Sequence, residues 1–285
     1  MNALPERALH YDVGDEIRLV ATGLGRADDP PVLLLHGGGQ TRQSWLGTGR
    51  RLAASGRYAV ALDMRGHGES TWAPSGEYRV ANFAADLLRV VETFERPPVI
   101  VGASLGGITA LLFTELYEES LLAGVVLVDI AATLEPEGAR RIAEWMISRS
   151  DGFESLEEVA DAIAEYTPQR KRPRNLASLE RVVRRGPDGR YRWHWDPRFM
   201  GAQGPAEVAD RARLLRAARS LRMPTLLVRG RESDVISAEG AAEFLEAAPH
   251  AEFADVSGAG HMVAGDRNDA FTAAVQAFLE RHHPV

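Results

Sequence analysis

Short apolar runs with little polar alternation recur along the chain, separated by stretches in which apolar positions follow helical spacing. Runs of this kind predict strands that are buried on both faces of a sheet. The predicted strands are residues 17–21, 32–35, 58–63, 99–101, 124–129, 225–228 and 251–256. The predicted helices include residues 80–94, residues 238–247 and a final helix from about Asp266 to Arg281. Because strands and helices alternate, the pattern predicts a three-layer α/β fold with a mostly parallel central sheet.

This alternation is interrupted between residues 132 and 219. Helical patterns dominate the stretch, strand patterns disappear, and arginines and aromatic residues are frequent. The chain therefore divides into a core, made of residues 1–131 and 220–285, and an inserted helical cap, made of residues 132–219. We expect the arginines of the predicted cap to lie on a solvated surface, balanced by nearby acidic residues.

A serine stands on a predicted sharp turn between the strand at 99–101 and the helical pattern that follows. The turn has the sequence Gly102-Ala103-Ser104-Leu105-Gly106. Glycines two positions before and two positions after the serine remove side chains that would collide where strand and helix nearly touch. We expect a strained backbone at Ser104, which would hold its hydroxyl in the open. Ser104 is therefore the candidate nucleophile.

A serine hydroxyl needs a base that takes its proton and returns it to a leaving group, and histidine suits this task near neutral pH. His261 follows the last predicted strand in a glycine-flanked loop that could let its ring reach Ser104. The second ring nitrogen needs a carboxylate partner. Asp234, after the penultimate strand, is the favoured candidate because it produces the chain order Ser, Asp, His. Asp129, at the end of the strand that follows the serine unit, is the alternative.

Attack on a carbonyl creates an oxyanion, which backbone N–H groups can stabilise. The amide of Leu105 is one candidate donor because it lies just past the serine, at the start of a predicted helix. The amide of Gly38, within the turn His36-Gly37-Gly38-Gly39, is the other, since the missing side chains there let a substrate approach. We interpret His36 as a residue that braces this loop.

Composition narrows the possible function classes. Among 285 residues, 33 Lys and Arg stand against 40 Asp and Glu, a net charge of −7 that argues against a nucleic-acid partner. The chain has no cysteine, which excludes disulfides, thiolate metal sites and a cysteine nucleophile. No apolar run is long enough to span a membrane, and charges near Met1 replace the apolar segment of a signal peptide. We expect a cytoplasmic monomer or homodimer that uses no metal or cofactor and acts on a small molecule.

Five motifs in a fixed order resemble those of the α/β-hydrolase superfamily, over essentially the whole chain. These motifs are His36-Gly37-Gly38, Asp63-x-Arg65-Gly66-x-Gly68-x-Ser70, Gly102-x-Ser104-x-Gly106-Gly107, Asp234 and Gly260-His261. The resemblance implies that Ser104 is the nucleophile, His261 the base and Asp234 the acid, with the insertion as a lid over the pocket. Epoxide hydrolases and haloalkane dehalogenases of the superfamily carry aspartate at the nucleophile position, so Ser104 argues against both.

Serine suits acyl transfer, so the sequence predicts a serine hydrolase that cleaves a small to medium, largely apolar carboxylic ester. A carbon–carbon bond hydrolase, a lactonase or a thioesterase would use the same groups. A ligand-binding sensor or carrier of this fold is the alternative outside enzymes. Aromatic residues of the predicted cap could line the substrate pocket. We expect Trp145, Trp193 and Trp195 to bind substrate, with the last two on one side of an extended segment.

Overall fold

The core of the protein is one mixed, mostly parallel sheet. The computed structural model describes residues 5–149, 151–167, 171–202, 204–205, 210–261 and 268–285. Within these residues the sheet holds eight strands in the order β1-β2-β4-β3-β5-β6-β9-β10. Their bounds are β1 (Glu6–Gly14), β2 (Ile17–Leu24), β3 (Pro31–Leu35), β4 (Tyr58–Asp63), β5 (Val99–Ala103), β6 (Gly124–Val128), β9 (Thr225–Gly230) and β10 (Glu252–Val256). The pairs β1–β2 and β2–β4 are antiparallel and all other pairs are parallel, which confirms the predicted α/β class.

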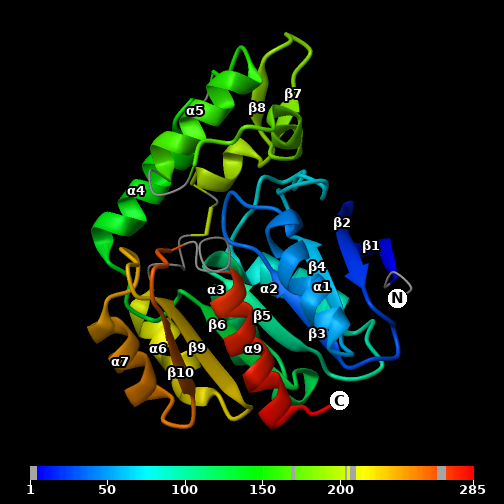
Figure 1. Cartoon of the computed structure of the whole chain (residues 1–285), viewed down its shortest axis with the longest axis vertical. Coiled ribbons are helices and arrows are strands. Elements are labelled where there is room, and N and C mark those ends of the chain that lie inside the picture. Colours follow the sequence, from blue (N-terminus) through cyan, green and yellow to red (C-terminus); the bar gives the residue numbers. More distant parts are fainter. Residues whose placement is uncertain (1–4, 150, 168–170, 203, 206–209, 262–267) are drawn as a thin grey trace.

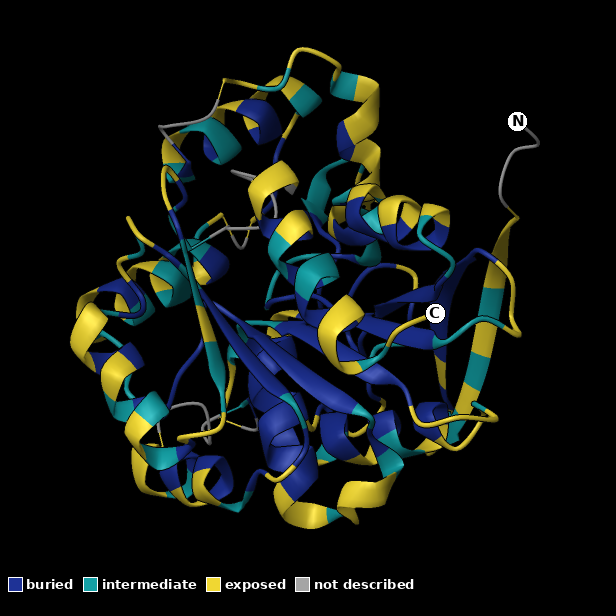
Figure 2. Ribbon diagram, turned by 60° about the horizontal axis from the view of Figure 1, so that its bottom comes forward, coloured by how far each residue is buried: buried dark blue, intermediate teal, exposed yellow. Residues whose placement is uncertain are grey.

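Helices cover both faces of this sheet, as Figure 1 shows. Outside the connection between β6 and β9, the described residues form the α-helices α1 (Leu46–Ala54), α2 (Val80–Val91), α3 (Leu105–Leu116), α7 (Ala238–Ala247) and α9 (Asn268–His282), and the 3-10 helices η1 (Arg42–Trp45) and η2 (Glu119–Leu121). Strand β3 alternates between two apolar cores: Leu33 and Leu35 pack with residues of α2 and α3, whereas Val32 and Leu34 pack with residues of α1 and α9. Both faces of the central strands are therefore buried, as Figure 2 shows in dark blue.

The sequence pattern missed β1. This strand forms an antiparallel hairpin with β2 at the edge of the sheet, and all nine of its residues are exposed or half-buried. An exposed edge strand has no need for an apolar run, so no hydrophobic signal marks it. The helix predicted at 80–94 ends at Val91. The predicted start of the last helix, Asp266, lies outside the described residues.

The predicted cap, residues 132–219, is not purely helical. It contains α4 (Pro136–Ile147), α5 (Leu156–Tyr166) and α6 (Arg211–Ser220), the 3-10 helices η3 (Leu176–Arg181) and η4 (Pro197–Met200), and strands β7 (Val183–Arg185) and β8 (Tyr191–Trp193). The two strands form an antiparallel hairpin, so the prediction that strands disappear is wrong here. Both strands are three residues long, too short for a pattern to reveal.

Figure 1 shows α4, α5 and the β7–β8 hairpin together at one end of the sheet. Helix α6, in contrast, packs against α3 beside the sheet. The boundaries 132–219 therefore stay a prediction, and the last helix within them lies with the core helices. None of the helices seen in the described parts of the chain is both long and apolar enough to cross a membrane.

Candidate active site

Ser104 stands on the turn between β5 and α3 in a backbone conformation that few side chains adopt. Its φ is 47° and its ψ is −115°. A Cβ atom at Gly102 would lie 2.5 Å from the carbonyl carbon of Gly106, and one at Gly106 would lie 2.5 Å from the carbonyl oxygen of Leu35. Both glycines are therefore required by the close approach of strand and helix, and the expected strain at Ser104 is confirmed.

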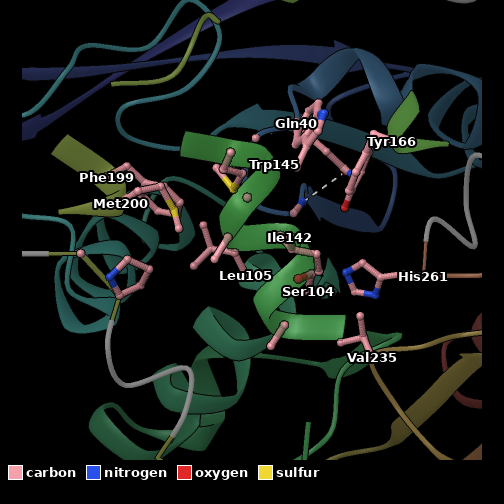
Figure 3. A pocket seen from close by; sticks show the side chains of 18 of the residues that line it. Gln40, Ser104, Leu105, Ile142, Trp145, Tyr166, Phe199, Met200, Val235 and His261 are labelled. Carbon is pink, nitrogen blue, oxygen red and sulfur yellow. Dashed lines mark hydrogen bonds between the residues drawn. The ribbon is translucent and has the colours of Figure 1, made fainter. Parts of the chain in front are cut away.

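His261 pairs with Asp129. The Nδ1 atom of His261 lies 2.7 Å from Oδ2 of Asp129, whose side chain is fully buried at the end of β6. The other carboxylate oxygen accepts the N–H of Gly230 at 2.9 Å, and Oδ2 also accepts the hydroxyl of Ser233 at 2.5 Å. A carboxylate with three donors is firmly oriented, so it can hold the imidazole in one tautomer. Figure 3 shows His261 and Ser104 facing the same cavity.

Asp234 lies elsewhere, which contradicts the preference for it as the partner of His261. Its carboxylate forms an ion pair with Arg141 of α4 at 2.6 Å, and 44% of its side chain is exposed. The turn after β9, closed by the bond from Ser233 N–H to the Gly230 carbonyl, directs Ser233 toward Asp129. The chain order Ser, Asp, His holds for Asp129 and for Asp234 alike, so order alone could not separate them.

The glycine loop, residues 37–40 after β3, lies beside the serine. A Cβ atom at Gly37 would lie 3.3 Å from Cβ of Ser104, and both Gly38 and Leu105 line the same cavity as Ser104. His36 braces the loop: its Nδ1–H donates to the Gly37 carbonyl at 2.8 Å, and its Nε2 accepts from the N–H of Met64 at 3.0 Å. Burial lowers the pKa of His36 to about 4, so the ring stays neutral.

A cavity of about 440 Å³ opens above Ser104, between the carboxyl ends of the strands and the predicted cap (Figure 3). Its apolar lining includes Ile130, Leu134, Ile142, Met146, Ile163, Phe199, Met200 and Val235. The polar side chains among the described lining residues are Gln40, Ser104, Trp145, Tyr166, Thr167 and His261. No carboxylate, lysine or arginine belongs to the part of the lining that the structure describes. The described lining is therefore mostly apolar, as is usual for a pocket that binds a small molecule.

Of the three tryptophans predicted to bind substrate, one lines the cavity and two lie behind it. Trp145 lines the cavity and stacks on Tyr166, with ring centroids 4.2 Å apart. Trp193 and Trp195 stack on each other at 5.0 Å, as the alternation of their segment predicts, but neither belongs to the described lining. They lie next to Trp145, with ring centroids 5.1 and 5.6 Å from it. The described geometry therefore makes them a support for that residue.

Several arginines of the predicted cap pair with acids on its surface, in keeping with the solvated face that we expected. Arg172 lies 2.5 Å from Asp161, and Arg192 lies 2.6 Å from Asp188. Arg170 lies outside the described residues. Among the residues that the structure describes, no group of three or more His, Asp or Glu side chains is arranged so that it could hold a metal ion.

Comparisons with known proteins place the chain in a family. A family model described as "alpha/beta hydrolase fold" matches residues 30–267. The chain is 29% identical to "Esterase Rv0045c" of Mycobacterium tuberculosis over 263 residues, which cover 88% of this chain and 83% of that protein. It is 28% identical over 224 residues to the "3-hydroxybutyrate-oligomer hydrolase" of Cupriavidus necator, covering 73% of this chain and 75% of that protein.

A similar solved structure extends over the whole chain. It is an alpha/beta hydrolase from Novosphingobium aromaticivorans, 27% identical, with a TM-score of 0.78 and coverage of 99% of both chains. The chain therefore belongs to the α/β-hydrolase family of enzymes.

Proposed function

We propose that this protein is a serine esterase that cleaves uncharged, largely apolar carboxylic esters through an acyl-enzyme. The observation that carries the proposal is that His261, which lines the same cavity as Ser104, pairs with the buried carboxylate of Asp129. That carboxylate contacts three hydrogen-bond donors, His261 among them. The names of the two relatives, an esterase and a 3-hydroxybutyrate-oligomer hydrolase, support ester hydrolysis. The apolar lining supports an uncharged substrate.

In the proposed first half-reaction, Oγ of Ser104 attacks the ester carbonyl while Nε2 of His261 takes the hydroxyl proton. The Nδ1–H of His261 donates to Asp129, which stabilises the imidazolium as it forms. Negative charge moves to the carbonyl oxygen, where the N–H groups of Gly38 and Leu105 would stabilise it. Collapse of the tetrahedral intermediate breaks the ester C–O bond, and His261 returns its proton to the departing alcohol.

In the second half-reaction, water replaces the alcohol. His261 takes a proton from the water as it attacks the acyl carbon, and the same N–H groups stabilise the new oxyanion. The bond to Ser104 then breaks, its oxygen regains a proton from His261, and a carboxylic acid leaves. Neither half-reaction requires a metal or a cofactor, so this chemistry needs only the protein and water.

We further propose that the predicted cap forms the substrate wall. Helix α4 supplies Ile142, Trp145 and Met146 to the cavity, and α5 supplies Ile163 and Tyr166. These side chains lie across from the glycine loop and the serine turn. The size and shape of the acyl and alcohol groups would therefore be selected by the cap, while the core supplies the reacting groups.

Labelling with a fluorophosphonate, together with hydrolysis of p-nitrophenyl butyrate, tests the proposal. Wild type should label and turn over the ester, and Ser104→Ala should lose labelling and about 10⁶-fold in kcat. Ser178→Ala, which removes a hydroxyl from the exposed surface of η3, is the matched control and should behave as wild type. A p-nitrophenyl ester with a carboxylate on its acyl chain should have a lower kcat/KM than the neutral ester. Wild type that neither labels nor cleaves any ester would refute the function.

A further inference from the structure

His194 connects the predicted cap to the glycine loop. It follows β8 directly, and only 1% of its surface is exposed. Its Nδ1 accepts the N–H of Gly68 at 2.8 Å, and its Nε2 lies 3.2 Å from the carbonyl oxygen of Gly39. Because Nδ1 is an acceptor, the single proton of the neutral ring lies on Nε2 and is donated to Gly39.

The surroundings of His194 keep this arrangement fixed. Burial, together with the neighbouring imidazoles of His67 and His36, lowers the pKa of His194 well below its usual value, so the ring stays neutral. The indole N–H of Trp72 donates to the backbone carbonyl of His194 at 3.1 Å. The ring also contacts Trp195 edge to face, with centroids 5.3 Å apart. The ring itself is therefore held by Gly68, Gly39 and Trp195, whereas the hydrogen bond from Trp72 reaches only the backbone carbonyl of His194.

The hydrogen bond from His194 to the Gly39 carbonyl lies next to the candidate oxyanion site. Gly39 has a φ of +72° and directly follows Gly38, whose N–H is one of the two proposed donors. His36 and the turn bond from Gln40 N–H to the Gly37 carbonyl hold the start of the loop. His194 holds the other side, from an element more than 150 positions away in the sequence.

The Gly68 end is itself fixed to the core. Gly68 belongs to the turn after β4, where the N–H of the next residue, Glu69, donates to the buried carboxylate of Asp63 at 3.0 Å. Arg184 of β7 donates to the Gly68 carbonyl at 2.5 Å, so the hairpin of the predicted cap contacts both sides of this glycine. His194 thus connects two loops of the core, one hydrogen-bonded to Asp63 of β4 and one that carries the proposed donor.

We propose that His194 is a positioning residue that aligns the Gly38 N–H with the developing oxyanion by anchoring the Gly39 carbonyl. The inference rests on the proposed esterase function. If His194 has this role, the β7–β8 hairpin of the predicted cap helps to position a catalytic group in addition to its part in the fold. Correct placement of an oxyanion donor acts on the transition state, so the effect should appear in kcat more than in KM.

Two substitutions at this position separate the contacts. His194→Asn keeps an acceptor near the place of Nδ1, for Gly68, but is too short to reach Gly39. His194→Gln is long enough to donate to Gly39. We expect His194→Asn to lower kcat for p-nitrophenyl butyrate by about 10- to 100-fold with little change in KM, less than the loss of a donor itself. His194→Gln should retain more of the activity than His194→Asn.

Trp72→Phe is the control, because it removes a hydrogen bond to the same residue without touching the glycine loop. It should keep the kcat of wild type. Thermal unfolding followed by circular dichroism shows whether each variant is folded. Equal kcat for wild type and folded His194→Asn would overturn the inference while leaving the esterase function intact. An equal loss in Trp72→Phe would overturn it too, since the effect would then come from local packing.

A second measurement does not depend on turnover. Hydrogen exchange followed by mass spectrometry on peptides that cover residues 36–41 should show faster exchange in His194→Asn than in wild type and Trp72→Phe. If wild type cleaves no ester, the proposed function fails, yet this exchange still decides whether His194 anchors the loop. Unchanged exchange in His194→Asn would refute the anchoring directly.

Discussion

Replacing Asp129 by asparagine is the sharpest test of the proposed triad. The carboxylate accepts three donors: the backbone N–H of Gly230 on Oδ1, and the Ser233 hydroxyl and His261 Nδ1 on Oδ2. An asparagine has one oxygen and one NH₂ group. The Gly230 N–H cannot reverse its role, so it selects the oxygen and places the NH₂ group where Oδ2 was.

That placement determines the effect on His261. A donor now faces Nδ1, so the neutral ring must carry its proton on Nε2, the atom that should accept the proton of Ser104. In a comparable triad this change of tautomer costs about 10⁴-fold in kcat. The same factor corresponds to about 5.5 kcal/mol in the activation free energy. The Ser233 hydroxyl can reverse its role and Gly230 keeps its bond, so the fold should survive.

The matched control is Asp234→Asn. Asp234 and Arg141 form a half-exposed ion pair, which contributes about 1 kcal/mol or less to the free energy of unfolding. Turnover of p-nitrophenyl butyrate should therefore stay close to wild type in Asp234→Asn and fall about 10⁴-fold in Asp129→Asn, with both variants folded by circular dichroism. Near-normal turnover in Asp129→Asn together with a large loss in Asp234→Asn would refute the reasoning.

Two further predictions concern stability. Burial lowers the pKa of His36 to about 4 and that of His67 to about 3, and it also lowers the pKa of His194. As the pH falls through the ordinary histidine pKa, the unfolded chain therefore binds more protons than the folded chain. The free energy of unfolding, measured by urea titration, should fall by roughly 1 kcal/mol per histidine between about pH 7.5 and about pH 5.5. Asp86→Ala should lower the free energy of unfolding by about 3–5 kcal/mol, because it leaves Arg65 buried without its bidentate partner.

Each of these has its own control. His10→Gln changes an exposed histidine and should leave the dependence on pH as it is in wild type, and a stability that is flat over this range would contradict the first prediction. Glu92→Ala breaks an exposed ion pair with Arg89 on the same helix as Asp86 and should change the free energy of unfolding by less than about 1 kcal/mol. A loss of that small size in Asp86→Ala would contradict the second.

Local features of the sequence were sufficient to predict the framework. Buried strands are visible in the sequence as apolar runs, because both of their faces must be apolar. Strands β3, β4, β5, β6 and β9 all lie where such runs predict them. The two glycines of the serine turn are also visible in the sequence, although the reason for them is partly tertiary: a Cβ atom at Gly102 would meet Gly106 within the turn, whereas one at Gly106 would meet Leu35 of β3. Elements that bury little left no such signal: the edge strand β1 and the short β7–β8 hairpin were missed.

The partner of His261 could be decided only by the tertiary structure. Asp129 and Asp234 both follow parallel strands and both fit the chain order, so the sequence by itself determined that an aspartate near the strand ends was available and no more. The turn after β9 sends Ser233 inward and Asp234 outward to Arg141, a matter of side-chain direction that spacing does not encode.

The contacts between the core and the predicted cap were also decided only by the tertiary structure. The alternation around Trp193 and Trp195 indicates correctly that they share a face, but which layer they occupy depends on how α4 packs above them. His194 carries no signal in the sequence because its two partners, Gly39 and Gly68, are backbone groups of distant loops. Sequence periodicity reports what a segment buries, whereas the identity of what it meets across the fold comes only from three-dimensional packing.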